Sequence, residues 1–213
     1  MRGFKHYLAA LLAALSAVPA NAQPQRIDGP GPMAHEAAAT TFPERIGAFR
    51  RTSVVRYGSN GQDLSAGYNL VRGGTQVAIT IYIYPALLGG NRVDACRREF
   101  DMTRRAIASI QQGVRPGAAV TPRLVNGADP ALSHRATFTF TADFAGTVQP
   151  VTSQLDLYCF VRDAWTVKVR ATAPAGHDVD AIVTEFIDAG PWPGRAPAER
   201  VAAVQAPVHL ASR

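Results

Sequence analysis

The chain has 213 residues, of which 47% are hydrophobic, and a formal net charge of +6. This length fits a single domain with a hydrophobic core. The sequence lacks the basic stripe with interleaved aromatics, and any recognisable module, that nucleic-acid binding would require. We therefore expect a surface of mixed charge and no nucleic-acid partner, while a weak attraction to anionic lipid or cell-wall polymer stays open.

Residues 1–22 have the three parts of a secretory signal peptide. Arg2 and Lys5 give a positive start, and an apolar run of eleven residues then leads to the small-x-small pattern Ala-Asn-Ala. Eleven residues are too few to cross a bilayer, which takes about 20. The sequence predicts cleavage after Ala22 and a soluble periplasmic or secreted protein without a transmembrane segment. Loss of Arg2 and Lys5 lowers the formal charge from +6 to +4.

Composition predicts the domain boundaries. Residues 23–41 are rich in proline, glycine and alanine, and the chain beyond residue 191 is similar, both without an apolar period. Such segments are typically flexible. We expect a flexible leader over 23–41, one folded domain over 42–192 and a flexible tail over 193–213.

The first half of the expected domain is rich in strands. A strand near 49–57 precedes a hairpin with arms at 64–71 and 75–85. Alternation is strict in the second arm, where one face carries Val77, Ile79, Ile81 and Ile83 and the other carries Ala78, Thr80, Tyr82 and Tyr84.

A helix is predicted over 92–112, with Asn91 as its N-cap and Gly113 at its end. Its apolar stripe has helical spacing and consists of Val93, Cys96, Phe100, Thr103, Ile107 and Ile110. Arginines and acids four residues apart occupy the rest of its surface, which favours a solvated, self-paired face over an anion site.

The second half predicts strands over 135–144, 147–161 and 165–172, followed by a helix over 178–189. In the last strand, alternation places Lys168 and Arg170 on the outer face. The connections are of hairpin length, which favours antiparallel pairing.

The order strands, helix, strands, helix predicts an α+β domain, in which a five- to seven-stranded, mostly antiparallel sheet packs with two helices. This element order resembles the small sandwiches of the Mog1 and PsbP type. The resemblance rests on no sequence motif, so no functional residue is carried over. The segments FPERIGAFRR, GYNLV and ITIYIYP also resemble exported bacterial proteins of unknown function, which implies no activity.

Motifs for catalysis or cofactor binding are missing from the sequence. It has no Gly-x-Ser-x-Gly elbow and no glycine-rich phosphate loop. No two histidines have the spacing of metal ligands. We expect no cofactor and no dedicated metal site.

Asp156 is the acid that stands out, because the strand over 147–161 places it beside Tyr158 and Phe160 on one face. If that face is covered, Asp156 must be paired, for example with an arginine on a neighbouring strand. If the face lines a cleft, Asp156 is the best acid–base candidate.

The two cysteines, Cys96 and Cys159, both fall on predicted core faces. They form no Cys-x-x-Cys motif, and an even count in an oxidising compartment favours a structural disulfide. Packed layers place the two Cα atoms about 7–8 Å apart, at the limit of disulfide geometry. Two buried thiols are therefore the alternative.

These patterns favour a non-catalytic binding or accessory module of the bacterial cell envelope, acting on a partner protein or a small ligand. Its candidate contact residues are Tyr82, Tyr84 and Arg72 around the hairpin, together with Asp156. One alternative is a periplasmic hydrolase in which Asp156, His134 and Ser65 converge only in three dimensions. Another is an envelope-surface or lipid-contacting protein that uses the arginine-rich surface.

Overall fold

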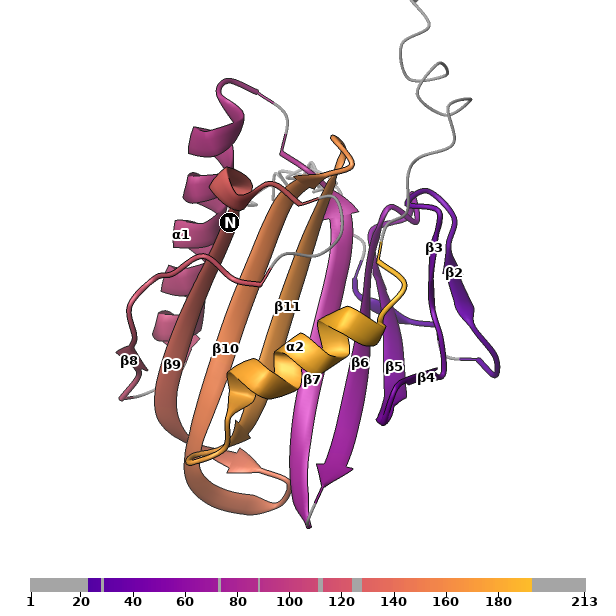
Figure 1. Ribbon diagram of the computed structural model, residues 1–213. Helices are drawn as coiled ribbons and strands as arrows, with labels where there is room; N and C mark the ends of the chain where they lie inside the picture. Colours follow the sequence, from indigo (N-terminus) through magenta and orange to yellow (C-terminus); the bar gives the residue numbers. More distant parts are fainter. Residues whose placement is uncertain are drawn as a thin grey trace, which may run out of the picture.

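One antiparallel sheet organises the chain in a computed structural model, which describes residues 23–27, 29–72, 74–87, 89–110, 113–123 and 128–192 (Figure 1). Nine strands form it. In sheet order they are β1 (Gln25–Arg26), β5 (Phe49–Tyr57), β6 (Asp63–Arg72), β7 (Thr75–Pro85), β11 (Trp165–Pro174), β10 (Thr147–Val161), β9 (Ser133–Phe144) and β8 (Arg115–Pro116), with β4 (Arg45–Ile46) paired to β5.

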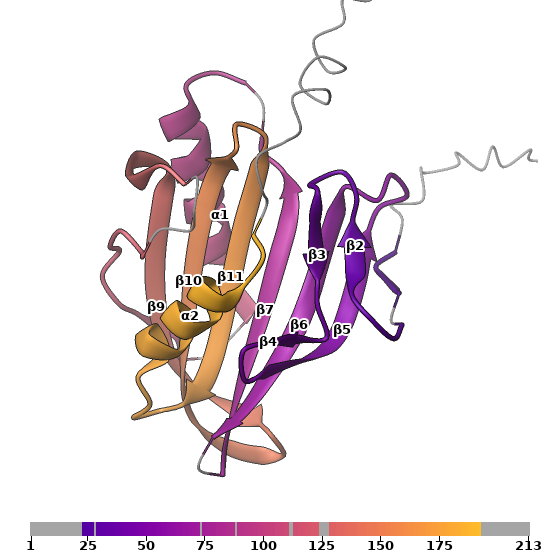
Figure 2. The ribbon, with the colours of Figure 1, turned by 45° about the vertical axis from the view of Figure 1, so that its right-hand side comes forward.

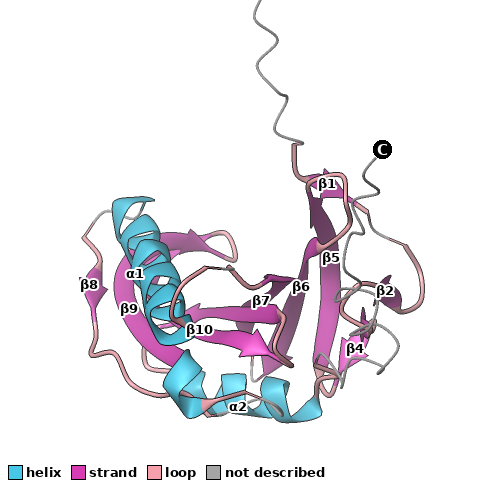
Figure 3. Cartoon of the chain, turned by 90° about the horizontal axis from the view of Figure 1, so that it is seen from above, coloured by secondary structure: helices cyan, strands magenta, loops and turns pink. Residues whose placement is uncertain are grey.

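The two helices cover opposite faces of this sheet (Figure 3). Helix α1 (Arg92–Ile110) packs mainly on β9 and β10, and α2 (Val179–Ala189) packs on β10 and β11. A short 3₁₀ turn, η1 (Pro130–Leu132), precedes β9. The α+β class and the mostly antiparallel sheet are thus confirmed.

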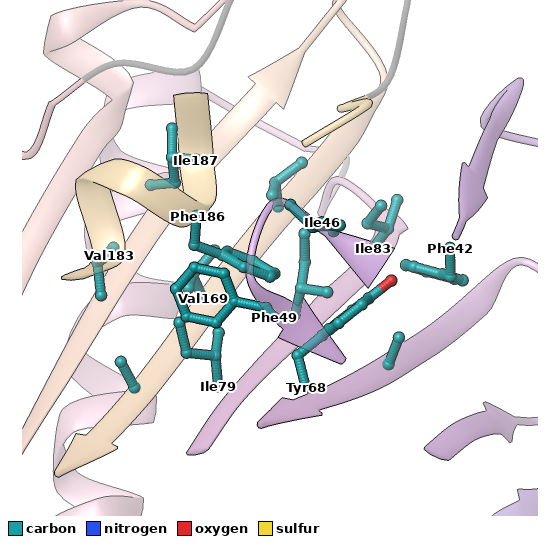
Figure 4. Packing of buried hydrophobic residues seen from close by; sticks show 14 of the residues in the cluster. Phe42, Ile46, Phe49, Tyr68, Ile79, Ile83, Val169, Val183, Phe186 and Ile187 are labelled. Carbon is teal, nitrogen blue, oxygen red and sulfur yellow. The ribbon is translucent and has the colours of Figure 1, made fainter. Parts of the chain in front are cut away.

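The face under α2 is apolar across most of its width. The inward residues of β7 meet Phe49, Tyr68 and Phe186, whose rings pack edge to face (Figure 4). Asp178 caps the helix by accepting a hydrogen bond from the Ala181 amide at 3.0 Å. Burial of each large apolar side chain contributes about 1.5–3 kcal/mol, so this cluster holds α2 on the sheet.

The opposite face is apolar only where α1 covers it. Phe100 and Ile107 pack there with Phe138 and Leu155. Cys96 of α1 and Cys159 of β10 form a disulfide with a Cα–Cα distance of 5.7 Å. The disulfide prediction is therefore confirmed, and the two Cα atoms lie closer than the expected separation of about 7–8 Å.

Two sequence expectations need correction. The sheet has nine strands rather than five to seven, because β1, β4 and β8 are only two residues long and too short to show a period. Residues 23–41 also carry structure rather than a flexible leader: β1 lies there, as do β2 (Met33–His35) and the start of β3 (Thr40–Phe42).

The β2–β3 hairpin lies at the β5 end of the sheet (Figures 1 and 2). His35 is fully buried there, where its Nε2 donates to the Ile83 carbonyl at 3.1 Å and its Nδ1 accepts from the Ala38 amide. Two hydrogen bonds thus satisfy a buried histidine that lies in the segment predicted to be a flexible leader.

The predicted signal peptide (1–22) and tail (193–213) lie outside the described residues. Trp192 packs on Phe186 with ring centroids 5.4 Å apart. Within the described chain, neither helix has the length and apolar character needed to cross a bilayer.

Candidate ligand-binding site

The α1 face of the sheet changes character beyond the strands that α1 covers. Lys168 of β11 lies opposite Tyr82 of β7, which in turn lies opposite Ser65 of β6. Register partners project from the same face, so a polar and aromatic row continues the face on which α1 packs.

This row lines a cavity of about 290 Å³, which we call the polar basin. Strands β5, β6, β7 and β11 form its floor and α1 forms one wall. Its lining residues are Tyr57, Asp63, Tyr82, Tyr84, Glu99, Thr103 and Lys168.

Lys168 is the only lysine beyond residue 5 of the sequence. Its Nζ lies 4.4 Å from the ring centroid of Tyr82 and 5.3 Å from that of Tyr84. Burial lowers the pKa of Lys168, and the negative charges of Glu99 and Asp63 partly offset this effect. The ammonium group therefore lies over two aromatic rings, and the charges of two acids partly offset the loss of water around it.

Glu99 reaches the basin from α1 and is 7% exposed. Its Oε1 accepts a hydrogen bond from the Tyr84 hydroxyl. Burial raises the pKa of Glu99, while the Tyr84 hydrogen bond and the charge of Lys168 act in the opposite direction. Burial also raises the pKa of Asp63, again opposed by Lys168. The basin thus combines two acids and one base whose charged forms are each disfavoured by burial.

The structure distributes the predicted contact residues between two faces. Tyr82 and Tyr84 line the basin, on the α1 face rather than beneath α2. Arg72 lies at the end of β6 with Thr75 as its backbone partner, and its side chain is outside the described part. Asp156 projects from the other face, because its register partner Val169 belongs to the α2 core.

Asp156 is fully buried and ion-paired. Arg135 on the neighbouring strand β9 donates to both of its carboxylate oxygens, at 2.7 and 2.8 Å. Tyr158 and Gln154 donate to it as well, each at 3.3 Å. Burial raises the pKa of Asp156, and these donors lower it. The face is covered and the acid is paired, which is the condition set above for a structural role.

Asp180 of α2 is a second carboxylate on the Arg135 guanidinium. This ion pair connects the first turn of α2 to β9, and through Arg135 to Asp156 of β10. The cluster fixes the helix on the sheet, and the Asp156 side chain within it is fully buried.

The three residues of the hydrolase alternative do not come together. Asp156 projects from the α2 face, whereas Ser65 and His134 lie on the α1 face. Ser65 is on β6 and His134 on β9, four strand positions apart, or about 19 Å at the usual strand spacing. His134 instead packs on Phe100, with ring centroids 5.1 Å apart.

Sequence reasoning missed Asp63, Glu99 and Lys168 as members of one site. Alternation had placed Lys168 on an outer face, but it could not show that α1 and three tyrosines enclose that face. Glu99 lies beside the helix stripe among arginines and acids, where a buried acid has the same local sequence as a solvated one.

No family model matches the sequence. A search of curated proteins likewise gives no significant match. Among the described residues, no group of three or more histidine, cysteine, aspartate or glutamate side chains could hold a metal ion. The interpretation of the basin therefore depends on its own chemistry.

Proposed function

We propose that this protein is a non-catalytic, exported binding module of the bacterial cell envelope, and that the polar basin takes a small polar ligand or one side chain of a partner protein. One observation carries the proposal: Lys168, held over Tyr82 and Tyr84 and facing Glu99 and Asp63, lines a cavity rather than a sealed core. Burying an ammonium group costs free energy. A ligand that accepts hydrogen bonds from this group would explain why the fold keeps it there.

The lining indicates the class of ligand. Aromatic rings form a floor for apolar ring or chain atoms, while Lys168 and the two acids offer both donors and acceptors. A volume of about 290 Å³ lies at the small end of ligand pockets, which usually hold about 300–1,000 Å³. These features fit a molecule of the size of a monosaccharide or an amino acid.

An enzyme is the second candidate, and the raised pKa of Glu99 inside a cavity is what favours it. This candidate would use Glu99 and Lys168 in place of Ser65, His134 and Asp156. Binding is the stronger proposal, because Tyr84 and Lys168 already engage the Glu99 carboxylate.

Three further features belong to the proposal. The signal peptide predicted over 1–22 supports export to the periplasm or the medium. The Cys96–Cys159 disulfide is suited to an oxidising compartment. Likeness to the Mog1 and PsbP sandwiches is supported by the order of elements alone.

A cavity-filling variant tests the binding proposal. Thr103→Phe places a ring in the basin from α1, and Met102→Phe adds the same ring at a neighbouring position that is 50% exposed. Native mass spectrometry of protein exported by a bacterial host should find a bound mass on the wild type and on Met102→Phe, but not on Thr103→Phe.

NMR titration with panels of monosaccharides and amino acids provides the direct measurement. We expect shifts at Tyr57, Tyr82 and Thr103 in the wild type, and none at these positions in Thr103→Phe. Equal responses in the two proteins, or no response to either panel and no bound mass, would count against a ligand in the basin.

A further inference from the structure

A second cavity, of about 410 Å³, lies where β1 and β4 flank β5, and we call it the arginine cleft. It shares no lining residue with the polar basin. Its lining residues are Arg26, Gly29, Glu44, Arg45, Arg50, Arg51, Thr52 and Ser53.

The cleft has a structurally fixed side. The Arg51 guanidinium donates to the carbonyls of Phe42, Gly29 and Gly31. Glu44 accepts a hydrogen bond from the Gly31 amide. These contacts tie the segment before β2 and the end of β3 to β5, so they hold the wall of the cleft in one conformation.

Two other arginines are arranged differently. Arg45 of β4 and Arg50 of β5 are direct register partners in the antiparallel ladder, and both are exposed. Like charges directly opposite each other on two strands destabilise the pair. Neither guanidinium has a hydrogen-bond or ion-pair partner among the described residues. Glu44 is the one acid among the described lining residues, and its Oε1 accepts from the Gly31 amide. The described part of the cleft therefore brings two positive groups together without a carboxylate paired to either.

We propose that the arginine cleft binds a phosphate group. Guanidinium groups present planar forks of donors that match phosphate oxygens, and two forks from adjacent strands can share one group with three or four acceptor oxygens. The anion would remove the repulsion between Arg45 and Arg50. Arg51, by contrast, is occupied by backbone carbonyls and forms part of the wall.

The phosphate could belong to a free phosphate or phosphate monoester, or to a lipid headgroup at a membrane surface. Both sources present at least two non-bridging phosphate oxygens, the minimum that the forks of Arg45 and Arg50 need. Three probes distinguish them: inorganic phosphate, glycerol 1-phosphate, and phosphatidylcholine vesicles with or without phosphatidylglycerol.

The test compares the wild type with Arg45→Gln/Arg50→Gln. A matched control, Arg97→Gln/Arg98→Gln, removes the same charge from two exposed positions of α1 that do not line the cleft. We expect saturable shifts of the Thr52 and Ser53 backbone amide NMR signals, which report on the cleft in every variant, with at least one probe at constant ionic strength. The cleft variant should bind at least tenfold more weakly, and the control should bind like the wild type.

Folding does not confound this comparison, because the substitutions remove a like-charge pair and should leave the melting temperature unchanged or higher. Arg45→Gln alone provides a milder second variant. Response to the soluble probes assigns the site to free phosphate or a monoester, and response to phosphatidylglycerol vesicles alone assigns it to a headgroup. The proposal is overturned if no probe gives a saturable response, or if both cleft variants bind as the wild type does.

Discussion

Two buried carboxylates on opposite faces of the same sheet have different surroundings. Asp156, in the sealed α2 face, meets an arginine that donates to both of its oxygens. Glu99, on the α1 side, meets the hydroxyls of Tyr84 and Thr166 and the charge of a lysine in a cavity, without a guanidinium from the described residues. Burial raises the pKa of both acids, so burial alone does not identify a binding residue. The distinguishing features are the completeness of the pairing and the presence of an opening.

The largest expected effect concerns the sealed pair. Arg135→Met leaves Asp156 buried without its partner, which should lower the free energy of unfolding by about 3–5 kcal/mol. The double variant Arg135→Met/Asp156→Leu removes both charges and should recover much of this loss. Urea denaturation measures both values. A loss below about 1 kcal/mol in the single variant would show that this ion pair contributes no more to stability than a surface ion pair does.

The disulfide gives the next largest effect. Cys96→Ala/Cys159→Ala removes a cross-link that spans 63 residues, and the free energy of unfolding should fall by about 2–4 kcal/mol. Glu99 lies one turn after Cys96, so the Glu99–Tyr84 contact should also loosen, while the Asp156–Arg135 pair on the far face should not.

Chemical denaturation and carboxyl NMR signals test this pair of expectations. Equal changes at Glu99 and Asp156 would contradict the separation of the two faces. Arg92→Gln, which removes an exposed ion pair with Asp163, serves as a control that should cost less than about 1 kcal/mol.

The smallest expected effect is a pKa shift that tests the difference between Glu99 and Asp156 directly. Lys168 lowers the pKa of Glu99, so Lys168→Met should move the carboxyl titration of Glu99 to higher pH, and Lys168→Arg should leave it nearly in place. An acid whose pKa is raised on folding stabilises least when it is ionised. The contribution of Glu99 is therefore fully present below its ordinary pKa of 4.5 and is lost as pH rises through the folded-state value.

Carbon-13 NMR of labelled carboxyl groups measures this shift. In the same variant, the Asp156 signal should not move, because Lys168 lies on the opposite face of the sheet. An unchanged Glu99 midpoint in Lys168→Met would show that the two groups are not coupled.

The long elements of the fold could be predicted from the sequence. Strict alternation in β7 predicted the side that faces a core, and so did the α1 stripe at Cys96, Phe100 and Ile107, whereas Val93 of that stripe is 44% exposed. The two cysteines were correctly paired. The two-residue strands β1, β4 and β8 could not be predicted, because a period needs several residues. The buried His35 could not be predicted either, because its partners are backbone groups of Ile83 and Ala38.

The candidate site was only partly predictable. Alternation correctly assigned Tyr82 and Tyr84 to one face of β7, but it predicted that this face points to solvent. A helix covers part of each face of the sheet, so alternation alone cannot tell which face is exposed. Lys168 and Glu99 meet through a helix-to-sheet contact between segments far apart in the sequence. No local pattern contains that information.

Strand β7 supplies both the core and the basin, with alternate residues assigned to each. Its odd-numbered positions, from Val77 to Ile83, are buried in the core cluster that contains Phe42 and Phe186, and Tyr82 and Tyr84 line the basin. Substitutions at the even-numbered positions can therefore change what the basin accepts without altering the packing beneath α2. For protein engineering, even-numbered residues of β7 can be changed to alter ligand specificity, and odd-numbered residues to alter stability. Both kinds of change require that the pairing register of the strand is kept.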